Sequence, residues 1–399
     1  MIKNVRLGVR KLLRKVVSGI MMTLLLIGVL PLTLSIQPVK AEPTTIIVPH
    51  DYPTIKEAIE AANAGDTIIV SAGYYAEGQI IVNKPLSLIA DGYVLVDGPE
   101  ILLQSAFYVT SDNVTIKGFI IRRSHNGIRL GDVDWCVIEG NSLIRNYDSI
   151  SSWAFGDHNI IRENRITTFE QYAIALRGSA SFNVIEENEI IGTLISEEPG
   201  FFGGIYLDWD FSQNTICYNT ISLETTPPRG AGIWLNRYSS QNDVSYNSIS
   251  GGSIGIYIWG SDHNIVERNI VEDTRTGIGL GDSSGNIIRR NTLRNINKCY
   301  LMRACAINLH YGGNYQNIVE KNFILGSYDG IFIEESCYTD ICDNVILNGA
   351  GYGLAVTANS NYTTIQKNVV LINQQFDLYW DQTGTGNTWT KNKYLTKNW

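Results

Sequence analysis

Residues 264–280 read N-I-V-E-R-N-I-V-E-D-T-R-T-G-I-G-L, and the same pattern returns along most of the chain. Two asparagines, Asn264 and Asn269, are each followed two residues later by an apolar β-branched side chain, and a Gly-apolar-x-apolar segment ends the unit at Leu280. The next copy starts at Asn286, so the period is about 22 residues. A unit of this length with three short apolar runs predicts one coil of a parallel β-helix.

The second asparagine of the unit forms a regular series. Its members are Asn141, Asn164, Asn188, Asn219, Asn247, Asn269, Asn291, Asn322, Asn344 and Asn368. Ile or Val stands three residues before each of them, and Leu, Ile or Val stands two residues after. Because stacked coils place equivalent residues about 4.8 Å apart, these apolar residues should form columns inside the stack. We expect the asparagines to adopt the left-handed backbone of a sharp turn and to bond the amides of adjacent coils, so they are structural.

The first 41 residues differ from the rest of the chain. Basic residues up to Lys15 precede an apolar run over residues 16–36, and residues 39–41 (V-K-A) resemble a cleavage site. This pattern is typical of a signal peptide, with an uncleaved membrane anchor as the alternative, and it predicts secretion to the periplasm or the cell exterior. Removing residues 1–41 takes away seven of the 31 Lys and Arg residues and none of the 39 acidic residues, which leaves a net charge of −15. This charge excludes nucleic acid and an anionic membrane surface as partners.

The remaining residues divide into three parts. Residues 42–112 hold irregular opening coils and a short capping helix, expected from Ile55 to Ala62 with Thr54 as its N-cap. Regular repeats fill residues 113–380, and residues 381–399 lose the repeat and should cover the last coil. Because a solenoid grows in one direction around one core, we expect a single domain.

The six cysteines all follow the leader, in an exported region where disulfides are possible. Cys136 replaces the first asparagine of its coil, which predicts a buried thiol. Cys299 and Cys305 share one insertion and could bridge locally. No Cys or His spacing typical of a zinc site is present in the sequence.

The opening of the exported part carries a family resemblance. Residues 45–75, T-I-I-V-P-H-D-Y-P-T-I-K-E-A-I-E-A-A-N-A-G-D-T-I-I-V-S-A-G-Y-Y, are followed at residues 80–92 by I-I-V-N-K-P-L-S-L-I-A-D-G. Together with the later coils, this stretch resembles the NosD-like proteins and, more widely, the pectate-lyase-like superfamily. The resemblance implies an exported right-handed parallel β-helix of three sheets, in a family named for a periplasmic copper-binding protein of nitrous oxide reductase maturation. It also implies that a groove, if present, lies on the first sheet. The sequence signatures of the superfamily's pectin methylesterases, polygalacturonases and alginate epimerases are absent.

Alternation along the Gly-apolar-x-apolar strand points two columns of side chains outward. Aromatic residues occupy these columns on three successive coils, beside amides and carboxylates. The residues that we expect to bind a ligand are Tyr206, Trp234, Asn236, Tyr257, Trp259, Asn308 and Phe332. Aromatic rings stack on the apolar faces of sugar rings while amides bond the hydroxyl groups, so this surface favours a glycan. The alternative is that these rings are present only because aromatic side chains suit a β-sheet.

Catalytic residues are harder to assign, and the candidates are His310, Glu334, Asp208 and Asp210. Asp208 and Glu334 lie five coils apart, far beyond the carboxylate spacing of a glycosidase. His310 and Glu334 lie on adjacent coils, close enough to form either a catalytic acid/base pair or a solvated surface pair. Arg177 beside Asp208 predicts a cross-strand ion pair.

Two metal ions, copper and calcium, are candidates for binding. Copper needs His, Met or Cys ligands, and the five histidines are scattered, so copper depends on the resemblance alone. Calcium could use Asp132, Asp157, Asp208, Asp210 or Asp282, although Asp in Gly-Asp turns is usually structural. The sequence therefore predicts no particular metal site and leaves the cofactor open.

The sequence predicts an exported, monomeric, all-β parallel β-helix whose first sheet binds a polysaccharide or a cell-surface glycan. Three alternatives stay open. The first is a polysaccharide lyase, hydrolase or epimerase, and the second is a periplasmic copper-binding accessory protein of nitrous oxide reductase maturation. The third is a passive surface or adhesion solenoid.

Overall fold

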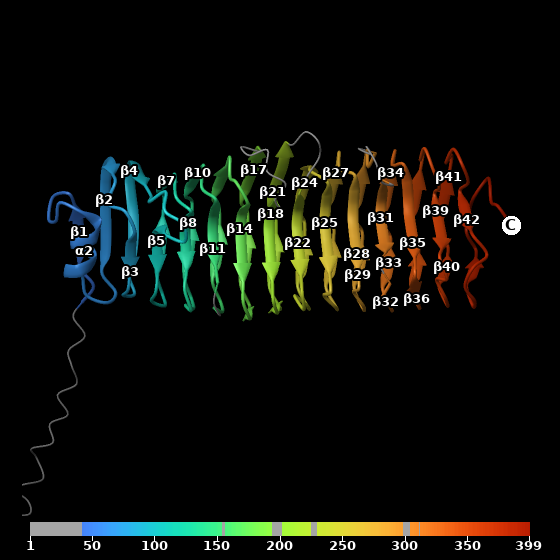
Figure 1. Ribbon diagram of the computed structural model, residues 1–399, viewed down its shortest axis with the longest axis horizontal. Coiled ribbons are helices and arrows are strands. Elements are labelled where there is room, and N and C mark those ends of the chain that lie inside the picture. Colours follow the sequence, from blue (N-terminus) through green and yellow to red (C-terminus); the bar gives the residue numbers. More distant parts are fainter. Residues whose placement is uncertain (1–41, 154–155, 194–201, 225–229, 298–303, 311) are drawn as a thin grey trace, which may run out of the picture. The chain divides into compact units, whose positions relative to one another are not determined.

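The computed structural model describes residues 42–399, except for residues 154–155, 194–201, 225–229, 298–303 and 311. The predicted leader, residues 1–41, lies outside the described residues. Residues Pro43–Trp399 form one compact unit of stacked coils (Figure 1). All pairings between its strands are parallel, which confirms the predicted β-helix. In the described part of the chain, no helix is long and apolar enough to cross a membrane.

The first strand of each coil belongs to a 13-stranded sheet that runs along the unit. Its strands are β3 (Ile80–Val82), β5 (Ser105–Val109), β8 (Asn126–Leu130), β11 (Asp148–Ser152), β14 (Tyr172–Arg177), β18 (Gly203–Asp208), β22 (Ala231–Asn236), β25 (Ile254–Trp259), β28 (Thr276–Gly281), β31 (Cys305–His310), β35 (Asp329–Glu334), β39 (Leu354–Thr357) and β42 (Leu378–Trp380). We call this the platform sheet.

The second and third strands of each coil form two further series. The second series comprises β6 (Thr115–Lys117), β9 (Val137–Glu139), β12 (Ile160–Arg162), β16 (Val184–Glu186), β20 (Thr215–Cys217), β23 (Asp243–Ser245), β26 (Ile265–Glu267), β29 (Ile287–Arg289), β33 (Ile318–Glu320), β37 (Asp340–Cys342), β40 (Thr364–Gln366) and β43 (Thr388–Thr390). The third series comprises β7 (Ile120–Arg122), β10 (Ser142–Ile144), β13 (Arg165–Thr167), β17 (Glu189–Thr193), β21 (Thr220–Glu224), β24 (Ser248–Gly251), β27 (Ile270–Glu272), β30 (Thr292–Arg294), β34 (Phe323–Leu325), β38 (Val345–Leu347) and β41 (Val369–Leu371).

Three strands near the amino terminus, β1 (Thr45–Val48), β2 (Thr67–Tyr75) and β4 (Ser87–Asp97), join these two series. The long β4 pairs with β6 through one end and with β7 through the other, so the two series count as one 26-stranded sheet. Two short pairs complete the strands: β15 (Ala180–Ser181) with β19 (Phe211–Ser212), and β32 (Asn314–Tyr315) with β36 (Ser336–Cys337).

The interior of the coils is filled by columns of apolar side chains. Ile128, Ile150 and Ile174 occupy aligned positions of β8, β11 and β14, and all three are fully buried. In most of the three-residue strands the central side chain is buried, as with Val266 of β26. Full burial of such a side chain contributes about 1.5–3 kcal/mol, so the repeated columns supply much of the stability.

The asparagines that follow the strands of the second series form the predicted amide ladder. Asn188 Nδ2 donates to Asn219 Oδ1 at 3.0 Å and to the Ile161 carbonyl oxygen at 2.9 Å, and the Asn188 backbone N–H donates to Asn219 Oδ1 at 3.1 Å. Both asparagines are about 1% exposed. The same bonds recur from Asn141 to Asn368, which confirms that these residues are structural.

The left-handed residue of each turn is not the asparagine, so that part of our prediction was wrong. The residue before it has the positive φ angle, for example Arg268 (φ 55°) before Asn269 and Lys321 (φ 54°) before Asn322. Both of these basic residues are exposed, because the left-handed residue lies on the outer side of the turn. The asparagine must face inward to reach its neighbours, and the bonds it makes offset the roughly 1–2 kcal/mol cost of the preceding left-handed residue.

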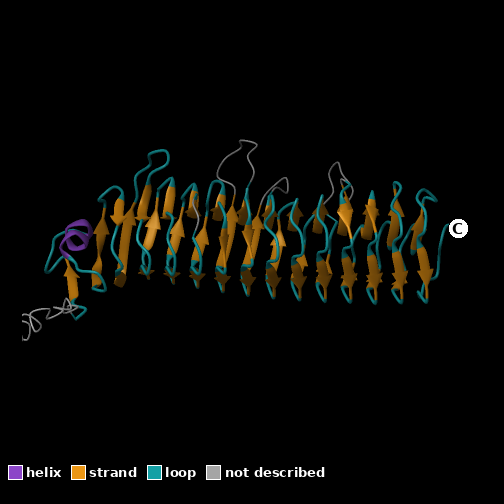
Figure 2. Cartoon of the chain, turned by 90° about the horizontal axis from the view of Figure 1, so that it is seen from below, coloured by secondary structure: helices purple, strands orange, loops and turns teal. Residues whose placement is uncertain are grey.

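The amino-terminal helix α2 (Ile55–Ala61) lies at the end of the coils (Figure 2) and buries Ile55, Ala58 and Ile59 against the core. Thr54 Oγ1 accepts from the Glu57 N–H at 3.1 Å, which confirms the predicted N-cap. Glu77 supplies a second cap that the sequence analysis missed. Its carboxylate accepts from the N–H groups of Ile55 at 2.8 Å and Lys56 at 3.0 Å.

The repeat continues beyond residue 380, where we expected it to end. Strand β43 pairs with β40, and Asn368 N–H donates to Asn392 Oδ1 at 2.9 Å, which adds one more step to the asparagine ladder. Trp389 and Trp399, with ring centroids 4.6 Å apart, pack against the core at this end.

Cys136 is fully buried and has no disulfide, as predicted, and burial raises the pKa of its thiol to about 11. Cys305 is also fully buried, at the start of β31. Its suggested partner, Cys299, lies outside the described residues.

Candidate functional site

The outward residues of the platform sheet lie in two axial columns. In the first column, Tyr206 of β18 aligns with Trp234 of β22, which aligns with Tyr257 of β25. In the second column, Asn236 aligns with Trp259. The ring centroids of Tyr206 and Trp234 are 5.1 Å apart, those of Trp234 and Tyr257 are 5.7 Å apart, and those of Tyr257 and Trp259 are 5.9 Å apart. The four rings therefore form one continuous row, which we call the aromatic row.

A depression of about 430 Å³ follows the aromatic row. It is lined by Tyr172, Tyr206, Trp234, Asn236, Arg237, Tyr257 and Trp259. Tyr206 and Asn236 are only 8% and 4% exposed, whereas Trp234, Tyr257 and Trp259 are partly exposed. The two tryptophans and Tyr257 thus present ring surface to a ligand, and the two buried residues support them from below.

Two outward glycines make room for the row. A Cβ atom on Gly281 of β28 would lie 2.6 Å from the Trp259 ring, and one on Gly279 would lie 3.2 Å from the Tyr257 ring. Both rings therefore lean over the neighbouring β28, which carries no side chain in either outward column. A side chain at these positions would force the rings away from the sheet, so these glycines shape the depression.

A buried polar network supports the row from one side. Tyr206 Oη donates to Asp208 Oδ2 at 2.8 Å, and Asn236 Nδ2 donates to Asp208 Oδ1 and to Tyr206 Oη, both at 3.0 Å. Arg237 Nε lies 3.9 Å from Asp208 Oδ1. Burial and the bond to Asp208 raise the pKa of Tyr206 to about 12, so this phenol stays protonated and orients the ring.

Arg177 does not pair with Asp208, which corrects our prediction. Its Nη1 bonds Asp148 Oδ2, on the adjacent strand β11, at 3.2 Å, and its guanidinium lies over the Trp153 ring at 4.5 Å. Asp148 is 1% exposed, and this burial raises the pKa of its carboxyl to about 6. The buried carboxylate attracts Arg177 more strongly than Asp208 does, because Asp208 already has Arg237, Tyr206 and Asn236 as partners.

Two of the residues predicted to bind ligand lie apart from the aromatic row. Phe332 is 7% exposed and packs in a separate cluster with Cys305 and Ala355. Asn308 is its neighbour in register. Neither residue lines the depression. Tyr206, Trp234, Asn236, Tyr257 and Trp259 are the predicted residues that the structure brings together.

The catalytic candidates fall into two separate places, Asp208 with Asp210 after β18, and His310 with Glu334 at the ends of the adjacent strands β31 and β35. The strand register keeps Asp208 and Glu334 five strands apart. Asp210 lies on a left-handed turn and accepts from Ser179 and Ser212, and not from the partners of Asp208. His310 lies parallel to the Tyr257 ring with centroids 6.2 Å apart, and burial lowers its pKa to about 4, so its imidazole is neutral at neutral pH.

The described residues do not fit a copper site. In the described ranges, no three His, Cys, Asp or Glu side chains are close enough together to hold a metal ion. The histidines are dispersed: His158 is stacked between Trp135 and Phe182, and His50 is exposed beside Asp51. Asp112, Asp134 and Asp157 serve the turns, each accepting a backbone N–H from the next coil.

The sequence analysis missed Tyr172 and Arg237. Strict alternation from Ile174 would turn Tyr172 inward, but Ala173 takes the inward position and the Tyr172 ring stacks on Tyr206 at 4.6 Å. Arg237 follows β22 in a left-handed turn (φ 45°), outside the strand pattern. No periodicity rule places a turn residue on a sheet face, so only the folded turn could reveal it.

The fold and this surface define a class: parallel β-helix proteins with an aromatic-lined sheet face. A family model described as "Periplasmic copper-binding protein (NosD)" matches residues 59–249 and 228–399, so the chain belongs to the NosD family. A cell surface glycoprotein of Methanothermus fervidus is 30% identical over 135 residues. That match covers 33% of this chain, and it spans only 22% of the glycoprotein.

Solved tailspike structures of E. coli bacteriophage HK620 share the fold. One, in complex with a pentasaccharide, has a TM-score of 0.55 at 11% identity and covers 85% of this chain and 73% of the tailspike. A double mutant of the same tailspike has a TM-score of 0.59 at 10% identity, with the same coverage. At such low identity, the likeness shows the fold alone.

Proposed function

We propose that this protein binds an extended polysaccharide or a cell-surface glycan along the aromatic row of the platform sheet. The observation that carries the proposal is the axial run of Tyr206, Trp234 and Tyr257 on three adjacent coils, at centroid separations of 5.1 and 5.7 Å, with Trp259 beside Tyr257 on the same strand. The coils repeat at about 4.8 Å, which is close to the length of one sugar residue in an extended chain. Successive sugars can therefore stack on the exposed rings of successive coils, Trp234 and Tyr257, without a change of register.

Polar groups beside the row suit the hydroxyl groups of such a chain. Asp208 and Asn236 lie under the rings, and Arg237 is partly free for a ligand because its side chain is 56% exposed. Trp209 and Tyr238, on the adjoining left-handed turns, are 57% and 75% exposed and widen the surface. Stacking with a few polar contacts is how proteins hold sugars, whereas a purely structural sheet face needs no exposed rings at its edge.

The comparisons support this proposal and an extracytoplasmic location. The tailspike with the same fold is in complex with a pentasaccharide, and the relative with partial identity is a cell surface glycoprotein. The family is described as periplasmic. We infer that the basic and apolar leader exports the chain, so that the platform sheet meets glycans outside the cytoplasm.

The test is a paired ring deletion. Trp234→Ala with Trp259→Ala should nearly abolish retention on a polysaccharide affinity gel, because each lost stacking ring costs about 1–3 kcal/mol by analogy with base stacking. Both side chains lie outside the coil interior, so the melting temperature should stay close to that of the parent.

The matched control is Trp135→Ala with Phe182→Ala. These rings are 56% and 52% exposed and lie on turns away from the platform sheet. This control should bind as the parent does. Equal retention of parent and platform variant on every glycan that the parent binds would refute the proposal, and no binding to a broad glycan panel would favour a passive solenoid.

A further inference from the structure

The sequence contains two sequons, that is, two copies of the N-x-Ser/Thr pattern that accepts N-linked glycans. One is Asn113-Val114-Thr115, which leads into β6, and the other is Asn361-Tyr362-Thr363, directly before β40. Transfer of a sugar chain to folded protein needs an accessible amide nitrogen on the asparagine and an accessible hydroxyl group two residues later. The two sequons differ in both respects in the folded chain.

Asn113 presents its amide to solvent. It occupies the left-handed position of a turn (φ 57°), which asparagine tolerates better than most residues, and it is exposed. Its backbone N–H donates to the Asp134 carbonyl oxygen at 3.0 Å, whereas its side-chain amide makes no hydrogen bond within the described residues. Val114 is fully buried, and Thr115, the next residue, is partly exposed on the outer face of β6. Both groups that the transfer needs are therefore accessible.

The second sequon is closed by its own hydrogen bonds. Asn361 Nδ2 donates to the Asn359 carbonyl oxygen at 2.5 Å and to Cys337 Sγ at 3.8 Å, and Asn361 Oδ1 accepts from the Thr385 N–H at 2.7 Å. A sugar on Nδ2 would have to break at least one of these bonds. Thr363 is fully buried, because it takes the place of the first asparagine of its coil. Its hydroxyl group is thus out of reach of a transferase while the coil is folded.

An aromatic ring in line with Asn113 offers a surface to the first sugar. Because β6, β9, β12 and β16 pair in register, Asn113 aligns with Trp135, His158 and Phe182, all in left-handed turns. The Trp135 and His158 rings are stacked with centroids 4.0 Å apart, so His158 covers one face of the indole. The other face is directed toward the coil of Asn113, where no ring of the described residues stacks on it. An asparagine side chain is shorter than an indole, so a sugar on its amide would lie over the outer part of that face.

We infer that Asn113 carries an N-linked glycan in the exported protein, and that the first sugar of this glycan packs on the open face of Trp135. The donor is an oligosaccharide activated as a lipid-linked phosphate ester. The bond between Asn113 Nδ2 and the sugar C1 forms, and the bond from C1 to the phosphate oxygen breaks. The phosphate leaves with that electron pair, and one Nδ2 proton passes to a base of the transferase. The inference rests on the export that we propose, and not on ligand binding at the aromatic row.

The first test incubates the purified, folded full chain with a single-subunit oligosaccharyltransferase and a lipid-linked oligosaccharide, and maps the added mass to peptides. Only Asn113 should be modified. Asn113→Gln and Thr115→Val should each abolish the modification, and Asn361→Gln, the matched control, should leave it unchanged. The protein isolated from its own cells should carry a glycan at Asn113 as well. Modification of Asn361 in the folded chain, or an unmodified Asn113 in either sample, would overturn the inference, whatever the retention on a polysaccharide gel.

The second test locates the first sugar by hydroxyl-radical oxidation of the glycosylated and the unmodified chain. Oxidation of Trp135, which is 56% exposed, should be at least about twofold slower in the glycosylated chain, because the sugar covers its one open face. Trp209 is the matched control: it is 57% exposed and also lies in a left-handed turn, after β18, so its oxidation rate should not change. An unchanged rate at Trp135, or equal slowing at both tryptophans, would overturn the placement of the sugar on this ring.

Discussion

The asparagine ladder shows how one residue type holds neighbouring coils in register. Asn269 Oδ1 accepts from the backbone N–H of Asn247 at 2.9 Å and from its Nδ2 at 3.0 Å, while Asn269 Nδ2 donates to the Val244 carbonyl oxygen at 2.8 Å. Asn269 N–H and Nδ2 also bond Asn291. The Asn269 side chain therefore links three successive coils by hydrogen bonds, and no apolar side chain can replace those bonds.

Asn269→Leu should lower the melting temperature strongly. It removes the side-chain partner of the Asn247 N–H and one partner each of Asn247 Nδ2 and the Val244 carbonyl oxygen, and a buried donor left without a partner costs about 1–3 kcal/mol. Arg290→Ala, at an exposed turn, should shift stability by no more than about 0.5 kcal/mol. Calorimetric melting of the two variants checks this, and similar melting temperatures would contradict a stabilising role for the ladder.

Asp148 makes stability depend on pH. Burial raises its folded pKa to about 6, above the value of about 3.9 for an unfolded aspartate, so the folded state keeps a proton that the unfolded state releases. Stability should therefore fall as pH rises from 4 to 6 and then level off.

Asp148→Asn removes this titration while its amide oxygen can still accept from the Tyr172 N–H, which bonds Asp148 Oδ1 at 3.1 Å. The melting temperature of Asp148→Asn relative to the parent should thus be higher at pH 7 than at pH 4. Exposed Asp273→Asn serves as the control and should follow the parent at both pH values. A relative melting temperature for Asp148→Asn that does not change with pH would contradict the raised pKa.

Among the strands, β28 affects the aromatic row because it has no side chain in either outward column. Its two outward glycines lie under Tyr257 and Trp259, so a strand with no outward side chain positions the rings of the strand before it. The glycine positions thus determine the ring orientation of the aromatic row, although glycine itself has no side chain to contact a ligand.

Gly281→Ala should weaken polysaccharide retention and change tryptophan fluorescence, because the new Cβ would lie 2.6 Å from the Trp259 ring and displace it. Gly131→Ala lies in the same outward column, and its Cβ would come no closer than 3.7 Å to an aromatic ring, so it is the matched control. Unchanged fluorescence and retention in Gly281→Ala would show that the ring does not rest on the glycine.

Helix α2 depends on two caps from different parts of the chain. Thr54 precedes the helix, whereas Glu77 lies 22 residues beyond Ile55 and accepts two of the first-turn N–H groups. Glu77 therefore links the helix to the first coil as well as capping it. This contact holds the helix over the apolar residues at the end of the interior.

Glu77→Ala should destabilise the amino-terminal end at least as much as Thr54→Ala, for which a loss of about 0.5–2 kcal/mol is typical. Hydrogen exchange of the α2 amides would measure both effects. Glu60→Ala, at an exposed position of the same helix, is the control. Slower amide exchange in Glu77→Ala than in Thr54→Ala would mean that the carboxylate cap is the weaker of the two.

At the scale of the whole molecule, family membership and site chemistry point to different ligands. The family is described as copper-binding, yet the residues that the structure describes bring no set of suitable ligands together. The surfaces that the stack of coils builds are instead rows and pockets of rings, amides and charges, which repeat along the axis because the coils do. A solenoid offers long surfaces of this kind more readily than a compact metal cage.

We expect isothermal titration with copper to show no tight stoichiometric site, only the weak binding of dispersed histidines. His125→Ala and His310→Ala should each leave the titration unchanged within error. A single tight site of fixed stoichiometry would overturn this expectation and favour the copper-binding accessory function.

The coil follows from the repeat pattern alone. Equivalent positions such as Val244, Val266 and Ile288 recur at a constant place in every unit, and a one-residue slip would turn an apolar column to solvent, so the register follows from the pattern. The same alternation correctly predicted the two outward columns, including Trp234 and Tyr257. The register and the outward columns depend on contacts between equivalent residues of adjacent coils, and the short repeat specifies these contacts.

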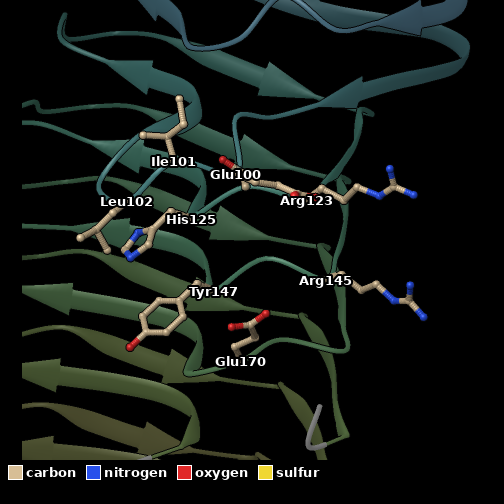
Figure 3. Close-up of a pocket in the computed structure, with 9 residues that line it drawn as sticks. Glu100, Ile101, Leu102, Arg123, His125, Arg145, Tyr147 and Glu170 are labelled. Atoms are coloured by element: carbon tan, nitrogen blue, oxygen red, sulfur yellow. The ribbon is translucent and has the colours of Figure 1, made fainter. Parts of the chain in front are cut away.

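The contacts between side chains of different coils and at the turns, in contrast, depend on the folded stack. Arg177 bonds Asp148 on the preceding coil instead of Asp208 on the next coil, because Asp208 already has partners in the polar network around Tyr206. A depression of about 660 Å³ (Figure 3) gathers Leu102, Ser124 and Tyr147 from three turns, and the loop that carries Leu102 lies outside the regular repeat. Turn conformation and burial are set by the stacked coils together, and no single repeat contains that information.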